Sequence, residues 1–268
     1  MRNSFNWWGQ PDSWDEAPTL SILHLVENHT LDSATAALLW LFAERKASFI
    51  VASPPRLAGK STTMNAILGL RKPEVGLVHT KGSWEDFAFL KQTEPSKTYI
   101  VCNEISAHLP MYSWGESVLT MFQAVGRGYS LASTMHADSP EEVLADLRHP
   151  EVDVPPELLG HLALVVNILA GRTRQGVIRR VREVWMQDAA PQGEASFRAI
   201  ARWQQHSDTF IQDTTPEALA AIKKRLAFQG DLQAEMERRR QLLEGWLAEG
   251  VRDYEDVRRK VAEFYAQG

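Results

Sequence analysis

Residues 48–62 read SFIVASPPRLAGKST and decide what kind of fold the chain can adopt. The first five of them form a short apolar run that leads into prolines, which predicts a buried strand entering a loop. A helix is predicted to follow, from residue 60 to about residue 70. A strand, a loop and a helix in this order are the setting in which backbone N–H groups and a helix N-terminus converge on phosphate groups. The stretch therefore predicts a phosphate-binding loop.

Within this loop, the second half of the phosphate-loop pattern is matched by Gly59, Lys60, Ser61 and Thr62. A lysine at this place reaches the terminal phosphates, and the hydroxyl that follows it holds magnesium. The first half differs, because Pro54 stands where the pattern has its opening glycine and can neither donate an N–H nor adopt a positive φ. A bare Gly-Lys-Ser would be a chance helix start. The strand before it and the helix after it favour the phosphate loop.

Strand and helix signals continue to alternate after the loop. Strands are predicted at 75–79, 98–102 and 129–135, and helices at 114–125 and 140–147. Such alternation is typical of an α/β fold in which a mostly parallel sheet is covered on both faces. The later apolar runs at 162–169, 177–185 and 197–203 have no long helix between them, which predicts antiparallel pairing there.

Helical segments flank the α/β pattern on both sides. Two short helices are predicted within 19–46, and further helices are predicted after residue 214, among them 231–249 and 252–266. We therefore expect an N-terminal segment with helices at 1–46, an α/β core at 47–213 and a helical C-terminal subdomain at 214–268.

The composition is that of an ordinary globular protein, with 268 residues, 44% hydrophobic and 24% charged. A net charge of −5 produces a field that repels nucleic acid, so the sequence carries no direct nucleic-acid signal. A single cysteine, Cys102, excludes an internal disulfide and a multi-cysteine zinc site. The start of the chain has no signal-peptide pattern, and no apolar run reaches the roughly 18 residues that span a bilayer. These features predict a cytoplasmic protein.

Two polar residues follow predicted strands and are candidates for one site. Glu104 comes just after the strand at 98–102, and a carboxylate beside a phosphate loop can hold magnesium or its water ligands. His136 follows the strand at 129–135, where an imidazole can contact a γ-phosphate. Each has a simpler interpretation when taken alone: Glu104 as the first solvated residue after a strand, and His136 as a hydrogen-bonded histidine at a strand end. The phosphate loop favours the functional interpretation of Glu104.

Taken in order, these segments resemble the type II/type IV secretion ATPase superfamily, which includes the pilus-assembly, conjugation and archaellum motor ATPases. Residues 59–62 are similar to its Walker A loop, residues 103–106 to its Walker B segment, and residues 128–137 to its histidine box. The strand segments at 164–166 and 179–184 also look similar to later strands of this superfamily. The resemblance covers roughly residues 19 to 215, and the ordered series of boxes is more specific than any one of them.

The resemblance implies a RecA-like P-loop core that binds ATP and Mg²⁺ and assembles as a ring in a secretion or pilus machine. By the same resemblance, Lys60 neutralises the phosphates, and Ser61 and Glu104 hold the metal. In the same comparison Glu104 orders either the water or the metal, and His136 senses the γ-phosphate.

The chain departs from the family pattern at several places. The family has a glycine where Leu57 stands, besides the glycine that Pro54 replaces, and an acidic box after the second strand where this chain reads VHTK at 78–81. Glu85 and Asp86 lie a few residues later and are the candidate substitutes for the acidic box, with Glu85 as the candidate catalytic residue. Arg56 can offset part of the weakened loop by supplying a charge-assisted contact to a phosphate.

Two readings of function remain open at this point. Only 53 residues precede Pro54, so we expect the family's separate N-terminal domain to be missing. The leading hypothesis is a nucleotide-binding protein with slow or lost ATP hydrolysis. The alternative is a non-catalytic scaffold that keeps the P-loop fold and binds a partner through its C-terminal helices or its Trp-rich N-terminus, with Trp7, Trp8 and Trp14.

Overall fold

The computed structural model describes residues 19–54, 57–173, 176–188 and 196–267. Within these residues, one sheet contains eight strands in the order β2-β3-β4-β1-β5-β6-β7-β8. The strands are β1 (Ser48–Ala52), β2 (Gly76–His79), β3 (Thr98–Ile105), β4 (Ser130–Met135), β5 (Leu162–Thr173), β6 (Gly176–Gln187), β7 (Phe197–Gln204) and β8 (Thr209–Gln212). All pairings from β2 across to β5 are parallel, whereas β5 to β8 pair antiparallel. The predicted α/β class and the antiparallel end of the sheet are both confirmed.

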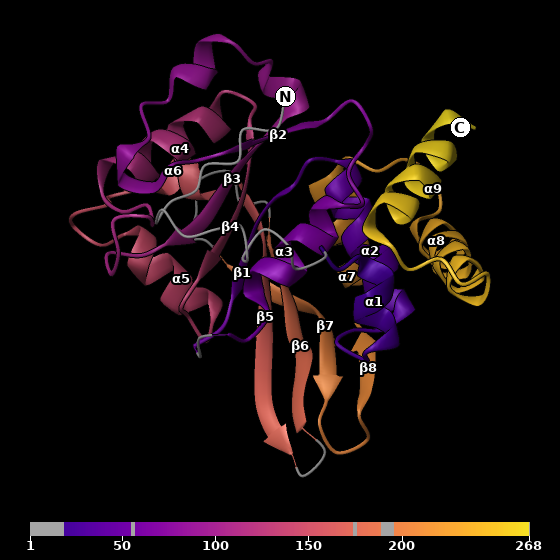
Figure 1. The fold of residues 1–268 in the computed structure, drawn as a ribbon. Helices are drawn as coiled ribbons and strands as arrows, with labels where there is room; N and C mark the ends of the chain where they lie inside the picture. Colours follow the sequence, from indigo (N-terminus) through magenta and orange to yellow (C-terminus); the bar gives the residue numbers. More distant parts are fainter. Residues whose placement is uncertain (1–18, 55–56, 174–175, 189–195, 268) are drawn as a thin grey trace, which may run out of the picture.

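Helices cover both faces of the parallel part of the sheet. The helices are α1 (Ile22–Glu27), α2 (Ser33–Glu44), α3 (Lys60–Leu68), α4 (Glu116–Gly126), α5 (Pro140–Leu147), α6 (Pro156–Leu159), α7 (Pro216–Leu226), α8 (Leu232–Ala248) and α9 (Tyr254–Ala266), and three short 3₁₀ helices, η1 (Gly82–Trp84), η2 (Ala88–Lys91) and η3 (Pro95–Lys97), lie between β2 and β3. In Figure 1, α4, α5 and α6 lie on one face and α1, α2 and α3 on the other, with α8 and α9 outside α2. The antiparallel strands project below this body.

The central strand β1 shows why the sheet needs cover on both faces. All five of its residues are buried. Successive side chains of a strand point to opposite faces. Phe49 and Val51 accordingly join the cluster beneath α1, α2 and α3, and Ile50 and Ala52 join the cluster beneath α4, α5 and α6.

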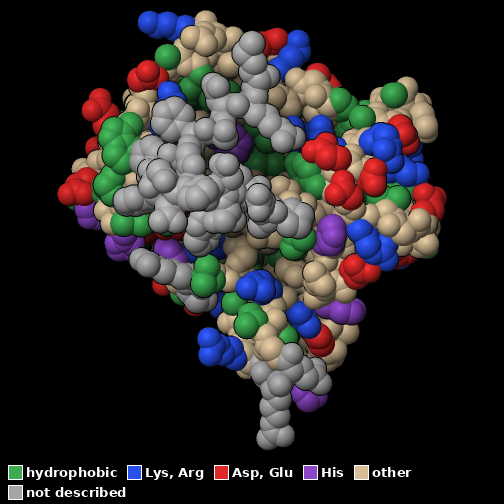
Figure 2. All heavy atoms as spheres, in the orientation of Figure 1, with side chains coloured by type: hydrophobic (Ala, Val, Ile, Leu, Met, Phe, Trp, Pro, Cys, Tyr) green, Lys and Arg blue, Asp and Glu red, His purple; other side chains and the backbone are tan. Residues whose placement is uncertain are grey.

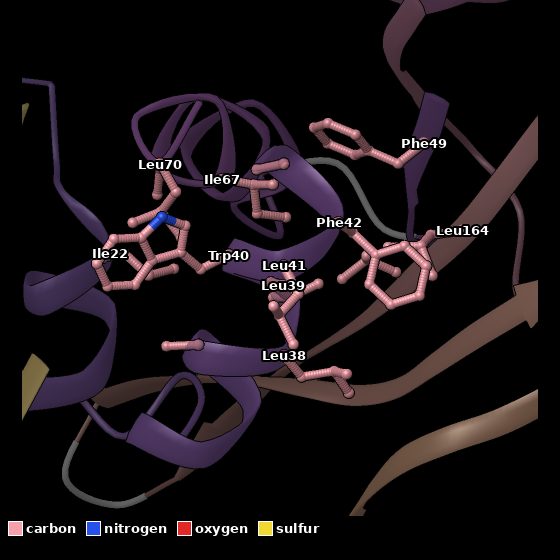
Figure 3. Close-up of a cluster of buried hydrophobic side chains, with 14 of the residues drawn as sticks. Ile22, Leu38, Leu39, Trp40, Leu41, Phe42, Phe49, Ile67, Leu70 and Leu164 are labelled. Atoms are coloured by element: carbon pink, nitrogen blue, oxygen red, sulfur yellow. The ribbon is translucent and has the colours of Figure 1, made fainter. Parts of the chain in front are cut away.

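Aromatic side chains of α2 connect the core to the C-terminal helices. Trp40 packs against Trp246 of α8 and Phe264 of α9, with ring centroids 5.5 Å and 4.8 Å away, and its Nε1–H donates to the Tyr265 hydroxyl at 2.9 Å. Figure 3 shows Trp40 and Phe42 on different sides of α2 within this cluster. One hydrophobic cluster therefore includes residues of the N-terminal helices, the sheet and the C-terminal helices.

A buried arginine completes this contact between α2 and α8. Arg239 is 3% exposed, donates to Glu44 of α2 and to Glu235 one turn earlier in α8, and lies over the Trp40 ring. The outer faces of α8 and α9 carry interspersed acidic and basic side chains (Figure 2), as expected for a solvated helix surface.

The structure differs from the sequence prediction mainly at the ends of elements. β3 continues to Ile105, so Glu104 lies inside the strand and not just after it. The strand β8 was not predicted, and α4 and α9 each begin two residues later than predicted. Residue Gly115, at φ 63°, precedes α4, and the Asp253 side chain caps α9 by accepting from the Glu255 and Asp256 N–H groups.

Trp7, Trp8 and Trp14 of the N-terminal segment lie outside the described residues. Among the residues that are described, no helix combines the length and the apolar character that crossing a membrane requires.

Candidate functional site

The predicted loop lies at the carboxyl end of β1 and leads into α3, as the sequence indicated. Gly59 is the residue before the helix and has φ +94°, a conformation that side chains rarely adopt. An added Cβ at Gly59 would lie 3.0 Å from Cδ of Arg179 on β6, so the glycine also permits this close approach. The first N–H groups of any helix have no acceptor within the helix, and those of α3 begin at this point.

Leu57 stands where the family pattern has a glycine. Its backbone has φ +60°, the left-handed region that a glycine adopts without strain. Its side chain is 88% exposed and lines the same cavity as Lys60. The leucine therefore affects the backbone conformation of the loop and also places a side chain at the cavity.

Lys60 brings the three predicted site segments together. Its side chain is only 7% exposed, and its Nζ lies 3.3 Å from Nδ1 and 3.4 Å from Nε2 of His136. The same Nζ lies 4.0 Å from Oε2 of Glu104. The loop after β1, the end of β3 and the end of β4 therefore meet at one ammonium group.

Three polar groups lie around the His136 ring. Its Nδ1 lies 3.0 Å from the Pro54 carbonyl oxygen, which can only accept a hydrogen bond. Its Nε2 lies 3.4 Å from Lys60 Nζ and 3.4 Å from Glu104 Oε1. The ring therefore lies between the loop after β1 and the end of β3.

Glu104 is held in place from both neighbouring segments. The Ser113 N–H donates to the Glu104 carbonyl at 3.0 Å, and the Thr134 hydroxyl of β4 donates to the carbonyl of Asn103 at 2.6 Å. The residue is 7% exposed, and its Oε1 forms no hydrogen bond within the described residues. A buried carboxylate oxygen with an open coordination position can accept from water or coordinate a cation.

The neighbouring cysteine on β3 takes no part in this chemistry. Cys102 is fully buried, and burial raises the pKa of its thiol. A protonated thiol is neither a good nucleophile nor a good metal ligand.

A cavity of about 1030 Å³ opens at this edge of the sheet. Six of the predicted site residues line it: Gly59, Lys60, Ser61, Thr62, Glu104 and His136. Arg56 lies outside the described residues. The sequence therefore located six residues of one cavity from their order along the chain.

Glu85 does not join these residues. It follows the 3₁₀ helix η1, where its Oε2 accepts from the Lys81 N–H at 2.9 Å and its Oε1 accepts from the Phe87 N–H at 2.8 Å. It is absent from the described residues that line the cavity. Both carboxylate oxygens thus stabilise their own turn, and a catalytic role for Glu85 stays a prediction.

The structure adds a residue that the sequence analysis missed. Arg179 on β6 lines the cavity, and its Nη2 donates to the Leu57 carbonyl at 3.2 Å. This contact places a guanidinium beside the loop and in front of Gly59. The only signal in the sequence was a run of arginines on a predicted strand, which does not reveal what the strand crosses.

No protein-family model matches the chain. In sequence, it is similar to two uncharacterized proteins of Methanocaldococcus jannaschii. It is 26% identical to MJ0900 over 278 residues, which cover 93% of this chain and 49% of that protein. It is 24% identical to MJ1287 over 217 residues, which cover 69% of this chain and 76% of that protein. The chain thus spans about half the length of the first of these relatives.

Two solved secretion ATPases are similar in structure. The VirB11 ATPase of the Brucella suis type IV secretion system, solved in complex with sulphate, matches with a TM-score of 0.43 and 17% identity over 66% of this chain and 59% of that one. The Legionella pneumophila ATPase DotB matches with a TM-score of 0.37 and 12% identity over 80% of this chain and 58% of that one.

The donor set around Lys60 fits a magnesium ion that is bound together with phosphates. Mg²⁺ prefers oxygen ligands and is usually held by one or two protein groups, with water and phosphate oxygens as the others. Glu104 Oε1 and the Ser61 hydroxyl supply such oxygens in one cavity. The described residues contain no group of three or more His, Cys, Asp or Glu side chains that could hold a metal alone.

Proposed function

We propose that this chain binds ATP with Mg²⁺ in the cavity around Lys60 and hydrolyses it slowly or not at all. The observation that carries the proposal is the convergence of Lys60, His136 and Glu104 at 3.3–4.0 Å, beside a left-handed glycine at the start of a helix. A buried ammonium next to helix N–H groups is a strong site for a polyanion.

Each residue has a distinct role in this proposal. Lys60 neutralises the terminal phosphates, and the N–H groups at the start of α3 bind the phosphate oxygens. Ser61 and Glu104 hold the magnesium ion, which neutralises the charge of the phosphates, and Thr62 adds a second hydroxyl. His136 contacts the γ-phosphate, because its ring lies beside the Lys60 ammonium, with Nδ1 3.0 Å from the Pro54 carbonyl and Nε2 3.4 Å from Glu104 Oε1.

The loop geometry supports slow or lost turnover. Pro54 supplies no N–H to the phosphates, and Leu57 holds a conformation suited to glycine. The resemblance of the motifs to those of secretion ATPases supports ring assembly in a secretion or pilus machine, at the cytoplasmic side of a membrane. The missing N–H of Pro54 and the backbone conformation of Leu57 also favour a second candidate function, a scaffold that keeps the fold and does not bind nucleotide.

A titration with ATP, with and without Mg²⁺, separates the two candidates. We expect Mg²⁺ to tighten ATP binding in the natural chain, and Glu104→Gln to abolish most of that Mg²⁺ effect. The matched control is Glu141→Gln, an exposed position in the first turn of α5. If ATP does not bind at any concentration while the chain is folded, the scaffold is the better account.

A further inference from the structure

A second cavity, of about 510 Å³, lies at the opposite edge of the sheet from Lys60. Its walls include Ser48, Ser130 and Ala163, which stand at the amino ends of β1, β4 and β5. These strands are parallel, so the cavity and the 54–62 loop are separated by the length of the strands. Nothing in the proposed nucleotide site uses this cavity.

Basic side chains from separate segments line it. Lys46 precedes β1, His161 precedes β5, and Arg225 belongs to the last turn of α7. Arg45 adds a more exposed guanidinium at the rim. The described residues that line the cavity include no aspartate or glutamate.

Hydrogen bonds to the backbone fix two of these cations in place. Both Nη atoms of Arg225 donate to the Gly160 carbonyl at 3.0 Å. The Nζ of Lys46 donates to the Pro95 carbonyl at 2.7 Å and to the Gly128 carbonyl at 3.2 Å. A guanidinium has five N–H donors and an ammonium has three, so each group keeps donors for a ligand.

The protein supplies little negative charge to balance these groups. Arg225 forms no ion pair with a carboxylate in the described part of the chain, and burial lowers its pKa. Burial also lowers the pKa of Lys46 to about 8, and burial together with Arg225 lowers the pKa of His161. Glu94 attracts Lys46, but its carboxylate forms an ion pair with Lys97 at 2.9 Å. Burial disfavours the charged form of each of these groups. A bound anion would stabilise that charged form.

We propose that this cavity binds a phosphate group, either inorganic phosphate or the phosphate of a small phosphomonoester, through Lys46, His161 and Arg225. A phosphate carries a charge of about −1.5 to −2 near pH 7, which matches a lysine and an arginine better than a carboxylate does. A planar guanidinium also suits the oxygens of a phosphate. The volume lies within the range of about 300–1,000 Å³ that is usual for small-ligand sites.

The test is a calorimetric titration in the Lys60→Ala background, because the 54–62 loop is itself proposed to bind phosphate. We expect inorganic phosphate to bind this variant, and Arg225→Gln to weaken that binding by about tenfold or more. The matched control is Arg238→Gln, at an exposed position of α8. Two further ligands are compared with inorganic phosphate in the same titration. Tighter binding of glycerol 3-phosphate than of inorganic phosphate points to a phosphorylated small molecule as the ligand. Binding of acetate as tight as that of inorganic phosphate overturns the proposal.

A second measurement does not depend on the folding of Arg225→Gln. The Lys46 pKa can be followed by NMR of ¹³C-labelled lysine, and we expect phosphate to move it upward from about 8. The groups that face Lys46 are Arg45 on its own segment, Glu94 before η3, and Arg225 and His161 across the cavity. His161→Gln, which removes an imidazole that lines the cavity, should reduce the shift. An unchanged Lys46 titration at saturating phosphate would overturn the proposal.

Discussion

The Lys60 ammonium lies 3.3 Å from Nδ1 of His136, although the two residues are 76 positions apart in the chain. The contact joins the loop after β1 to the end of β4, two strands that are neighbours in the sheet. Because Glu104 lies within 4.0 Å of both side chains, a change at any one of the three alters the electrostatics of the other two.

His136→Ala should weaken ATP binding more than ADP binding. In our account, His136 contacts the γ-phosphate, which only ATP carries. A lost charge-assisted contact of about 1.5–3 kcal/mol corresponds to roughly a 10- to 100-fold loss for ATP. Competition binding of both nucleotides measures this difference, with His108→Ala, at an exposed position, as the control. Equal losses for ATP and ADP would assign His136 a structural role only.

Arg179→Gln should weaken the binding of ATP and the binding of ADP by similar factors, on the order of tenfold. The guanidinium lies beside Leu57 and in front of Gly59, where phosphates common to both nucleotides would bind. Calorimetry with both nucleotides measures the effect. Arg172→Gln, on the partner strand of the same hairpin, is the matched control. Unchanged or tighter binding in Arg179→Gln would show that this arginine does not hold phosphate.

The double variant Pro54→Gly with Leu57→Gly should bind ATP more tightly than the natural chain, by about one decade. Glycine at position 54 restores an N–H donor, and glycine at position 57 removes a strain of order 1 kcal/mol or more from a residue at φ +60°. Asp153→Gly is a control, because this exposed residue also has a positive φ of 50° but lies outside the loop. If the folded double variant gains no affinity, the loop does not limit binding.

The ion pair between Arg180 and Asp208 should make stability depend on pH in the acid range. Arg180 donates to Asp208 at 2.7 Å and 2.8 Å, and this pairing lowers the Asp208 pKa to about 2. A lowered carboxylate pKa stabilises the fold above the unfolded value of about 3.9, and this stabilisation is lost as the pH falls toward 2. Because Asp208 is half-exposed, we expect Asp208→Asn to cost about 1 kcal/mol or less at pH 7.

Urea unfolding of the natural chain and of Asp208→Asn at several pH values measures this effect. The difference between the two proteins should be constant above about pH 5 and should shrink as the pH falls toward 2. A difference that stays constant down to pH 2 would mean that the ion pair contributes nothing.

Local sequence patterns were sufficient to predict most of the fold. The apolar run at β1 and the cap and glycine signals of the helices act over a few residues, so they can be recognised without tertiary information. The strand β8 was missed because its four residues alternate between exposed and half-buried and carry no continuous apolar pattern. The end of β3 was misplaced because Asn103 and Glu104 are polar, although Glu104 is buried.

The sequence could predict only those site residues that come near the end of a predicted strand or directly after the phosphate loop. Gly59 and Lys60 belong to the loop and helix that follow β1, Glu104 lies near the end of β3, and the ends of neighbouring parallel strands lie at the same edge of a sheet. Arg179 enters from β6, and its position depends on the register of the antiparallel pairing with β5, which a local pattern does not reveal. Glu85 was selected by its distance from a motif, but its carboxylate satisfies N–H groups of its own turn.

The central claim is that Lys60 binds the phosphates of a nucleotide, and the most direct test is calorimetry of ATP with Mg²⁺ on the natural chain and on Lys60→Ala. Lys91→Ala, which removes an exposed lysine of η2, is the matched control, and circular dichroism verifies that all three proteins are folded. The account predicts that the natural chain and Lys91→Ala bind ATP alike, and that Lys60→Ala binds at least about tenfold more weakly. Equal ATP affinity in folded Lys60→Ala, or no binding by the natural chain, would contradict it.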